Sequence, residues 1–263
     1  MTTVILALDI GNTNMEFGLF EGRELRFSFR LGTNRDATSD EIGIMAAQFF
    51  AATNVDRKAV EEVLISSVVP QVMYSVNNAM VKYFGRRPLV VGANLPVRIE
   101  NRYGNPSEVG SDRLVAALGA YRKYGGPLIV VDFGTATTFD AVSGDGAYLG
   151  GAIYPGIKIS MDALFQKASK LPKVELVDPG KVIGTTTVSS MQAGAMYGYQ
   201  GAVLNIVERM RQEMGANAKV IATGGLSQMI DPKKEIFDTI DRRLMLDGLI
   251  MIYEDYCESR SER

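Results

Sequence analysis

Two short stretches of the chain place an aspartate and a glycine directly after an apolar strand. In "ILALDIGNTNMEFGLF" the apolar run breaks at Asp9–Asn14, and in "LIVVDFGTATTFDAV" it breaks at Asp132. The two aspartates are 123 residues apart, close to half of the 263-residue chain. A single Asp-X-Gly is a common turn, but two in the same context predict an internal repeat, with one strand–turn–strand in each half.

Turns of this kind have the chemistry of a phosphate site. An aspartate at the end of a buried strand costs free energy unless its charge is compensated, and Mg²⁺, which prefers oxygen ligands, can compensate it. Gly11 and Gly134 let the backbone approach a bulky anion, and short polar side chains nearby can donate to phosphate oxygens: Asn12, Thr13, Thr135, Thr137 and Thr138. We expect Asp9 and Asp132 to face each other across a cleft that holds the phosphates of a nucleotide and its cation.

A third stretch, "NRYGNPSEVGSDRLVAA", offers a proton acceptor. Its Gly110-Ser111-Asp112-Arg113 places a carboxylate beside a guanidinium at a predicted helix N-terminus. The N–H groups there favour an ionised Asp112, which can accept a hydroxyl proton, while Arg113 can bind a substrate carboxylate. The alternative is a helix cap followed by a surface arginine. Because the sequence contains no histidine, Ser-His-Asp and Cys-His catalysis are excluded.

The elements that must position these residues alternate between strand and helix, which predicts an α/β fold. Strands are expected at Val4–Asp9, Met15–Phe20, Glu24–Arg30, Val63–Val68, Leu89–Val91, Leu128–Asp132 and Lys219–Ala222. Helices are expected at Asp40–Ala52, Val72–Phe84, Ser111–Tyr124, Ser189–Met214 and Leu244–Cys257. Residues 151–171 suggest a loop around Pro155 followed by a helix. We expect two lobes, residues 1–118 and 119–263.

The composition and charge of the chain indicate which classes of binding partner are not expected. A net charge of −2 and a sequence pI near 5.4 provide no strong positive field for a nucleic-acid backbone. No apolar stretch approaches the 18 or so residues that a membrane span needs, so no membrane partner is expected. One cysteine, Cys257, excludes an internal disulfide and suits the reducing cytoplasm.

Several stretches together resemble the type III pantothenate kinase family. The resemblance lies in Asp9–Glu16, "NRYGNPSEVGSDR", "VVDFGTATTFD", "GGAIYPGI" and "GTTTVSSMQAG", and it runs from residue 4 to about residue 250. With the later "ATGGLS", it implies the actin-like ATPase (acetate kinase/sugar kinase/Hsp70/actin) fold, ribonuclease H-like, with two similar lobes. It also implies transfer of the ATP γ-phosphoryl group to the primary hydroxyl of pantothenate. The product is 4′-phosphopantothenate, in the first step of coenzyme A synthesis.

The resemblance also implies residue roles by position. Asp112 would be the catalytic residue, Asp132 would bind a monovalent cation (K⁺ or NH₄⁺), and Asp9 would belong to the Mg²⁺ shell. Pantothenate would contact Tyr103, Gly110, Ser111, Asp112, Arg113 and Thr187. ATP would contact Thr135 and the first loop, which consists of Asp9, Ile10, Gly11, Asn12, Thr13, Asn14, Met15 and Glu16.

The family resemblance implies a homodimer. Gly194, Gly198 and Gly201 lie on one face of the predicted helix Ser189–Met214, which suits a close helix–helix approach across a subunit boundary. Packing of this face on the core is the alternative. Two other functions stay open: a different small-molecule kinase of the same superfold, such as a sugar kinase, or a non-catalytic nucleotide-binding regulatory protein.

Overall fold

The computed structural model of the chain describes residues 3–215, 217–232 and 235–261. Contacts divide the chain into two units. Unit 1 comprises Met1–Ile99, Asn105–Arg122 and Arg243–Arg263, and unit 2 comprises Glu100–Gly104 and Lys123–Arg242. Within the described ranges, no helix combines the length and apolar character needed to cross a bilayer.

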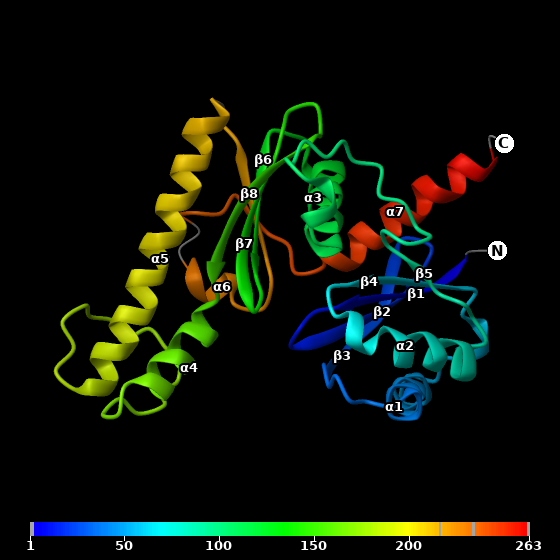
Figure 1. Cartoon of the computed structure of the whole chain (residues 1–263), viewed down its shortest axis with the longest axis horizontal. Helices are drawn as coiled ribbons and strands as arrows, with labels where there is room; N and C mark the ends of the chain where they lie inside the picture. The colour runs from blue at the N-terminus through cyan, green and yellow to red at the C-terminus, as the bar shows by residue number, and fades with distance from the viewer. Residues whose placement is uncertain (1–2, 216, 233–234, 262–263) are drawn as a thin grey trace. The chain divides into compact units, whose positions relative to one another are not determined.

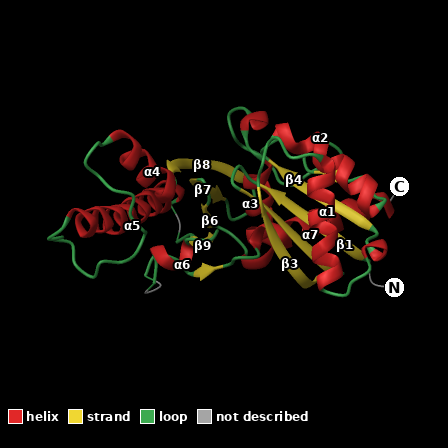
Figure 2. Ribbon diagram, turned by 90° about the horizontal axis from the view of Figure 1, so that it is seen from below, coloured by secondary structure: helices red, strands yellow, loops and turns green. Residues whose placement is uncertain are grey.

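Unit 1 is built on a mixed five-stranded sheet (Figure 2). Its strand order is β3 (Glu24–Gly32), β2 (Asn14–Glu21), β1 (Val4–Ile10), β4 (Glu62–Ser67) and β5 (Leu89–Val90). The first three strands form an antiparallel meander, whereas β1, β4 and β5 are parallel. Because β1 and β4 are parallel, their carboxyl ends meet at one edge of the sheet.

Helices cover both faces of this sheet. On one face, α1 (Ser39–Ala52), α2 (Pro70–Ala79) and the π-turn Met80–Phe84 pack on a core formed with β1–β4. On the other face lies α7 (Leu244–Ser261), which contacts β1 and β4 and crosses α3 (Ser111–Tyr124). A Cβ on Gly119 would lie 3.0 Å from the Cα of Gly248, so the α3–α7 crossing requires glycine at both positions.

Unit 2 repeats this topology. Its sheet order is β10 (Thr239–Ile240), β9 (Lys219–Thr223), β6 (Leu128–Phe133), β7 (Ala136–Val142) and β8 (Tyr148–Pro155). Here β6–β8 form the meander, and β6, β9 and β10 are parallel. The long helix α5 (Thr187–Met214) runs beside the sheet (Figure 1) and packs Val203 and Val207 against Ile129 and Val131. The predicted α/β fold with an internal repeat is confirmed.

The remaining elements are short. They are α4 (Ile157–Lys167), α6 (Ser227–Ile230) and the 3₁₀ turns Arg57–Ala59 and Pro106–Glu108.

One predicted element is wrong. The residues before Pro155 are not a loop but most of β8, which pairs with β7 from Ala136 to Val142. Proline ends this strand at its last residue, where no N–H is needed for the ladder, and Gly156 is then the N-cap residue of α4. The boundary expected between residues 118 and 119 stays a prediction.

Candidate active site

The first predicted turn lies at the carboxyl end of β1. Gly11 N donates to Asn14 O at 3.0 Å, which closes the turn between β1 and β2. Thr33, just after β3, forms two hydrogen bonds with this turn. Its hydroxyl donates to Gly11 O at 2.7 Å, and its N–H donates to Thr13 O at 2.9 Å. The side chains of Asn12, Thr13 and Asn14 are exposed, as donors to a phosphate must be, and Met15 is buried in the core.

Charged side chains flank this turn. Arg35 Nη2 donates to Asn12 Oδ1 at 3.2 Å, and Arg30 forms an ion pair with Glu16 at 2.7 Å across the β2–β3 ladder. Sequence reasoning missed Thr33 and Arg35. Their separation from the turn, about twenty residues, gave no local signal, although the meander predicted from the sequence brings the end of its third strand back to this turn.

The start of α3 lies at the same edge of unit 1. Ser111 Oγ donates to Ser67 O at 3.1 Å and lies 3.4 Å from Ser66 Oγ. Since Ser66 and Ser67 are paired in register with Asp9 and Ile10, the two serines join α3 to the strand beside the first turn. Unit 1 therefore brings together the Asp9–Glu16 loop and Gly110–Arg113, which are about 100 residues apart in the sequence.

The carboxylate of Asp112 is half-buried at this helix start. Its Oδ1 accepts a hydrogen bond from Arg113 N at 2.8 Å. Burial raises the pKa of Asp112 above its ordinary value, while the Arg113 N–H and the positive charge of Arg113 act in the opposite direction. Arg113 itself is only 9% exposed. A raised pKa makes the Asp112 carboxylate a stronger proton acceptor than an exposed aspartate.

The second turn belongs to unit 2 and is one residue shorter, but it is also closed by the N–H of its glycine. Gly134 N donates to Ala136 O at 3.1 Å, and Thr135 O accepts from Gly156 N at 3.2 Å. Thr135 is exposed, and Asp132 is half-buried at the end of β6, between Thr138 of β7 and Thr223 of β9.

A glycine keeps the space beside Asp132 free of a side chain. Gly224 has φ +86°, and a Cβ on it would lie 2.8 Å from Asp132 Oδ1 and 2.6 Å from Phe133 O. Carboxylate and carbonyl oxygens therefore converge beside Asp132, as a hard cation requires. Among the described residues, no three acidic or cysteine side chains cluster closely enough to hold a metal ion by themselves.

Thr187 and Tyr103 lie at different places in unit 2. Thr187 begins α5, after a capping box in which Thr186 and Ser189 bond each other's N–H groups, and it lines a cavity of about 920 Å³ between α4 and α5. Tyr103 is not among the described residues that line this cavity. It packs on Tyr148 instead, with the ring centroids 6.4 Å apart.

Comparison with known proteins gives one family. Residues 5–209 match the model of the type III pantothenate kinases. A type III pantothenate kinase of Moorella thermoacetica is 48% identical over 251 residues, which cover 95% of this chain and 99% of the relative.

Solved structures show the fold. A Campylobacter jejuni protein described as a Baf family transcriptional activator aligns with a TM-score of 0.60 at 20% identity, over 96% of this chain and 99% of its own. A Listeria monocytogenes protein described as an N-acetylmannosamine kinase aligns with a TM-score of 0.53 at 11% identity, over 97% and 99%. At these identities the likeness concerns the fold alone, which is that of the actin-like ATPases and sugar kinases.

Proposed function

Because the chain belongs to the type III pantothenate kinase family, it is an ATP-dependent pantothenate kinase, and we propose that Asp112 is its catalytic residue. The observation that carries this assignment is the hydrogen bond from Ser111 to Ser67 O, which fixes the start of α3 beside the Asp9 turn. A proton acceptor and a phosphate loop thus lie at one edge of one sheet.

The reaction needs mainly positioning and neutralisation of charge. The primary hydroxyl oxygen of pantothenate forms a bond to the γ-phosphorus of ATP, and the bond from that phosphorus to the β–γ bridging oxygen breaks, releasing ADP. The Asp112 carboxylate accepts the hydroxyl proton. This proton transfer comes late in a loose transition state, so Asp112 also serves by orienting the hydroxyl.

Further residues would bind pantothenate. Arg113 would pair with the substrate carboxylate from its buried position, beside the main chain of Gly110 and Ser111. Tyr103 and Thr187 would complete the site. The position of Thr187 on the wall of a cavity lined by Met161, Leu164 and Met191 supports a contact with a substrate that has both apolar and polar parts.

ATP would be bound by the two turns. In the first, the exposed Asn12, Thr13 and Asn14 donate to phosphate oxygens, while Ile10 and Met15 anchor the loop in the core. In the second, Thr135 serves as the donor. Arg35 adds a positive charge at Asn12.

The residues at both turns fit the cations that this reaction uses. Asp132, whose carboxylate lies close to the backbone of Gly224, would hold K⁺ or NH₄⁺. Asp9, half-buried at the end of β1, would contact the hydration shell of Mg²⁺. When bound, these cations supply positive charge that stabilises the phosphates.

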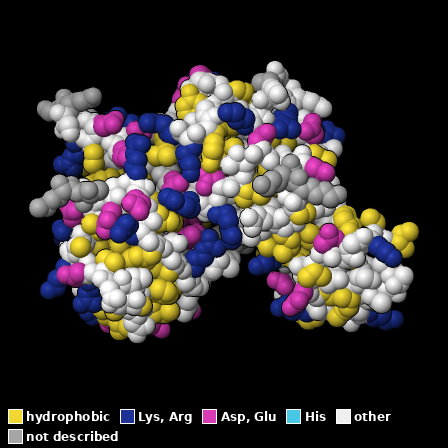
Figure 3. Space-filling model, turned by 180° about the vertical axis from the view of Figure 1, so that it is seen from behind, with side chains coloured by type: hydrophobic (Ala, Val, Ile, Leu, Met, Phe, Trp, Pro, Cys, Tyr) yellow, Lys and Arg dark blue, Asp and Glu magenta, His cyan; other side chains and the backbone are white. Residues whose placement is uncertain are grey.

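We also propose a homodimer that forms through α5. Gly194, Gly198 and Gly201 are exposed, and beyond the adjacent part of the helix a Cβ on any of them would have no heavy atom within 4 Å, which argues against packing on the core of unit 2. Exposed apolar side chains also lie on α4, on α5 and between them: Ile159, Leu164, Phe165, Val182, Ile183, Val188 and Leu204. The space-filling view shows hydrophobic side chains over this part of the surface, on the right (Figure 3). Sedimentation as a monomer at micromolar concentration would contradict the dimer.

We place the enzyme in the cytoplasm, where ATP is available and its one cysteine stays reduced.

A substrate panel tests the function as a whole. The purified protein is given ATP, Mg²⁺ and K⁺ with pantothenate or with each of a set of sugars, and the products are identified by mass spectrometry. Formation of 4′-phosphopantothenate alone is the expected result. A phosphorylated sugar would point to the sugar kinase alternative, and no product with any acceptor would point to a regulatory nucleotide-binding protein.

A further inference from the structure

A five-residue segment, Glu100–Gly104, leaves unit 1 and joins the β7–β8 hairpin of unit 2. Arg102 N donates to Tyr148 O at 2.9 Å, and Tyr148 N donates to Glu100 O at 2.8 Å. Asn101 and Tyr148 form a parallel bridge, so the segment acts as a short extra strand beside the first residue of β8. Neighbouring side chains of an extended segment point to opposite sides.

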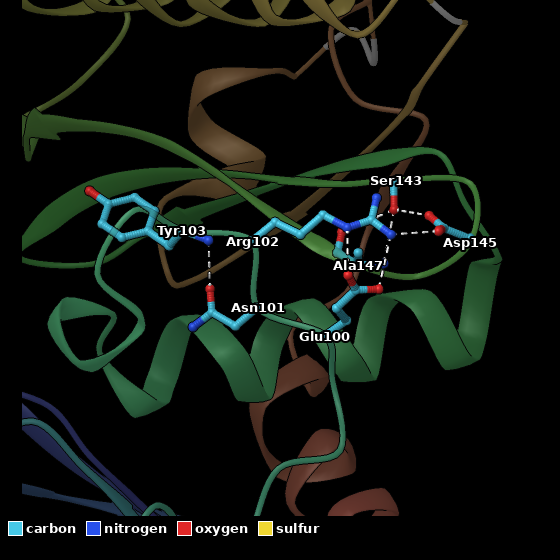
Figure 4. A network of polar contacts seen from close by, with 7 residues as sticks. All are labelled: Glu100, Asn101, Arg102, Tyr103, Ser143, Asp145 and Ala147. Atoms are coloured by element: carbon cyan, nitrogen blue, oxygen red, sulfur yellow. Dashed lines mark hydrogen bonds and ion pairs between the residues drawn. The ribbon is translucent and has the colours of Figure 1, made fainter.

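On one side, four residues form what we call the Arg102 clamp: Glu100, Arg102, Ser143 and Asp145 (Figure 4). Arg102 binds both carboxylate oxygens of Glu100, at 2.8 and 2.9 Å, and its Nη2 also donates to Asp145 Oδ2 at 2.8 Å. Asp145 in turn accepts from the Ser143 hydroxyl. Ser143 Oγ also accepts from Ala147 N at 2.9 Å, which fixes the β7–β8 turn.

On the other side lies the Tyr103 ring (Figure 4). Tyr103 N donates to Asn101 Oδ1 at 3.0 Å, which orients the main chain at this residue. The ring lies over Gly150, where φ is +119° and an added Cβ would be 3.3 Å from a ring carbon. It also packs on the fully buried Tyr148, whose hydroxyl donates to Asp140 at 2.8 Å. Gly150 and Tyr148 therefore form a fixed surface beneath Tyr103, and the position of the ring on this surface also depends on the segment that carries it.

We propose that Arg102 and Asp145 are positioning residues for Tyr103, and that the Arg102 clamp fixes this aromatic ring for pantothenate binding. The inference rests on the pantothenate contact proposed above for Tyr103. Its physical basis is entropic. A short connecting segment would sample several conformations, and substrate binding would have to order it, whereas the clamp orders it beforehand.

The electrostatics of the clamp agree with this role. Glu100 and Asp145 raise the pKa of Arg102. The hydrogen bonds from Arg102 lower the pKa of Glu100, and hydrogen bonds from Ser143 and then from Arg102 lower the pKa of Asp145. All three side chains are charged at neutral pH. Since they are exposed, salt screens them, and the clamp should weaken at high ionic strength.

Steady-state kinetics test the proposal. R102A and D145N should each raise the KM for pantothenate about three- to tenfold, because substrate binding must then order the segment, with kcat and the KM for ATP unchanged. R102K keeps the positive charge but not the bidentate contact with Glu100, so its KM for pantothenate should lie between those of the wild type and R102A. The matched control is R26A, because Arg26 of β3 is exposed and forms ion pairs with Glu21 of β2 and Glu24 of β3.

A double-mutant cycle shows whether the clamp acts through Tyr103. Y103A alone should raise the KM for pantothenate, and adding R102A to it should have no further effect. If the two changes multiply, the clamp acts by another route and the proposal is overturned. If Y103A leaves the KM for pantothenate unchanged while pantothenate is still phosphorylated, Tyr103 does not contact pantothenate and the proposal is overturned. The assignment as a pantothenate kinase is not affected by that result.

Fluorescence gives a readout that does not depend on activity. The chain contains no tryptophan, so Y103W introduces a single tryptophan at the ring position, which can be excited at a wavelength that the tyrosines do not absorb. Its anisotropy should fall when R102A is added and when salt is raised, and it should not change with R26A. Unchanged anisotropy in Y103W/R102A would show that the clamp does not hold the ring.

Discussion

The hydroxyl of Ser111 donates to the main-chain oxygen of Ser67 at 3.1 Å, and this bond joins the N-terminus of α3 to the carboxyl end of β4. Ser67 pairs in register with Ile10, the residue before the glycine of the first turn. Asp112, the proposed proton acceptor, and the Asp9–Glu16 loop, the proposed phosphate loop, therefore depend on the same two parallel strands.

Gly110 leaves room for the Asp112 carboxylate. A Cβ at Gly110 would lie 2.5 Å from Asp112 Oδ1, so G110A must turn that side chain away. We expect kcat to fall by at least about tenfold, since a displacement of about 1 Å can cost about a hundredfold in rate, with ATP binding retained. The control is G32A, where an added Cβ would have nothing within 4 Å. Equal kcat values for the two variants would show that the placement of Asp112 does not limit the reaction.

The raised pKa of Asp112 predicts two pH effects. Because only the carboxylate accepts a proton, kcat should fall as the pH drops through a pKa above the ordinary value of about 4. We specify kcat at saturating substrate because the carboxyl of pantothenate titrates in the same range.

The raised pKa of Asp112 affects stability in the opposite direction: kcat should increase with pH, whereas the contribution of Asp112 to stability should decrease. A carboxyl whose pKa is higher in the folded than in the unfolded state contributes stability below the unfolded pKa, and it loses that contribution as the pH rises through the folded pKa. D112N carries no such charge, so the Tm of D112N minus that of the wild type should increase between about pH 4 and pH 7. A difference that stays constant or decreases over this range would contradict the assigned burial effect.

Arg35 should assist ATP binding. Its exposed guanidinium contacts Asn12, so R35A should raise the KM for ATP up to about fivefold, the effect of about 1 kcal/mol at an exposed site, and leave the KM for pantothenate unchanged. R57A, an exposed arginine on the 3₁₀ turn before β4, is the control. If R35A raises the KM for pantothenate and not the KM for ATP, the proposed role of Arg35 in ATP binding is wrong.

Asp132 should make the enzyme dependent on a monovalent cation. Activity should collapse in sodium-only buffer and return with K⁺ or NH₄⁺, with choline chloride keeping the ionic strength constant. G224A should raise the K⁺ concentration needed for half-maximal activity, because its Cβ would enter the space beside Asp132 Oδ1. If the choice of monovalent salt has no effect, the role of Asp132 is wrong.

Periodicity and turn chemistry predict much of this fold, because they are local. The two Asp-X-Gly hairpins and the C-terminal helix follow from neighbouring residues. The sequence also predicts that Ser39 or Thr38 caps α1, and in the structure the cap is Thr38. The spacing of apolar residues in α1 predicts a buried stripe of Ile42, Met45, Ala46 and Phe49. The structure agrees only in part: Ile42 and Ala46 are buried and Phe49 is half-buried, but Met45 is 46% exposed.

Long-range arrangements could not be predicted in this way. The close approach of Gly119 to Gly248 joins segments 129 residues apart, and the contacts of Thr33 and Arg35 with the first turn depend on the register of the meander. The Arg102 clamp likewise depends on a hairpin about 40 residues further along the chain. The facing of Asp9 and Asp132 across a shared cleft stays a prediction.

The turnover of D112N with saturating ATP and pantothenate tests the central claim most directly. We predict that kcat for 4′-phosphopantothenate formation falls by at least about a hundredfold, the usual contribution of a general base, while the Kd for ATP measured by calorimetry stays close to that of the wild type. A variant that keeps near-normal turnover would contradict the account, and so would one that loses ATP binding in proportion to its loss of rate.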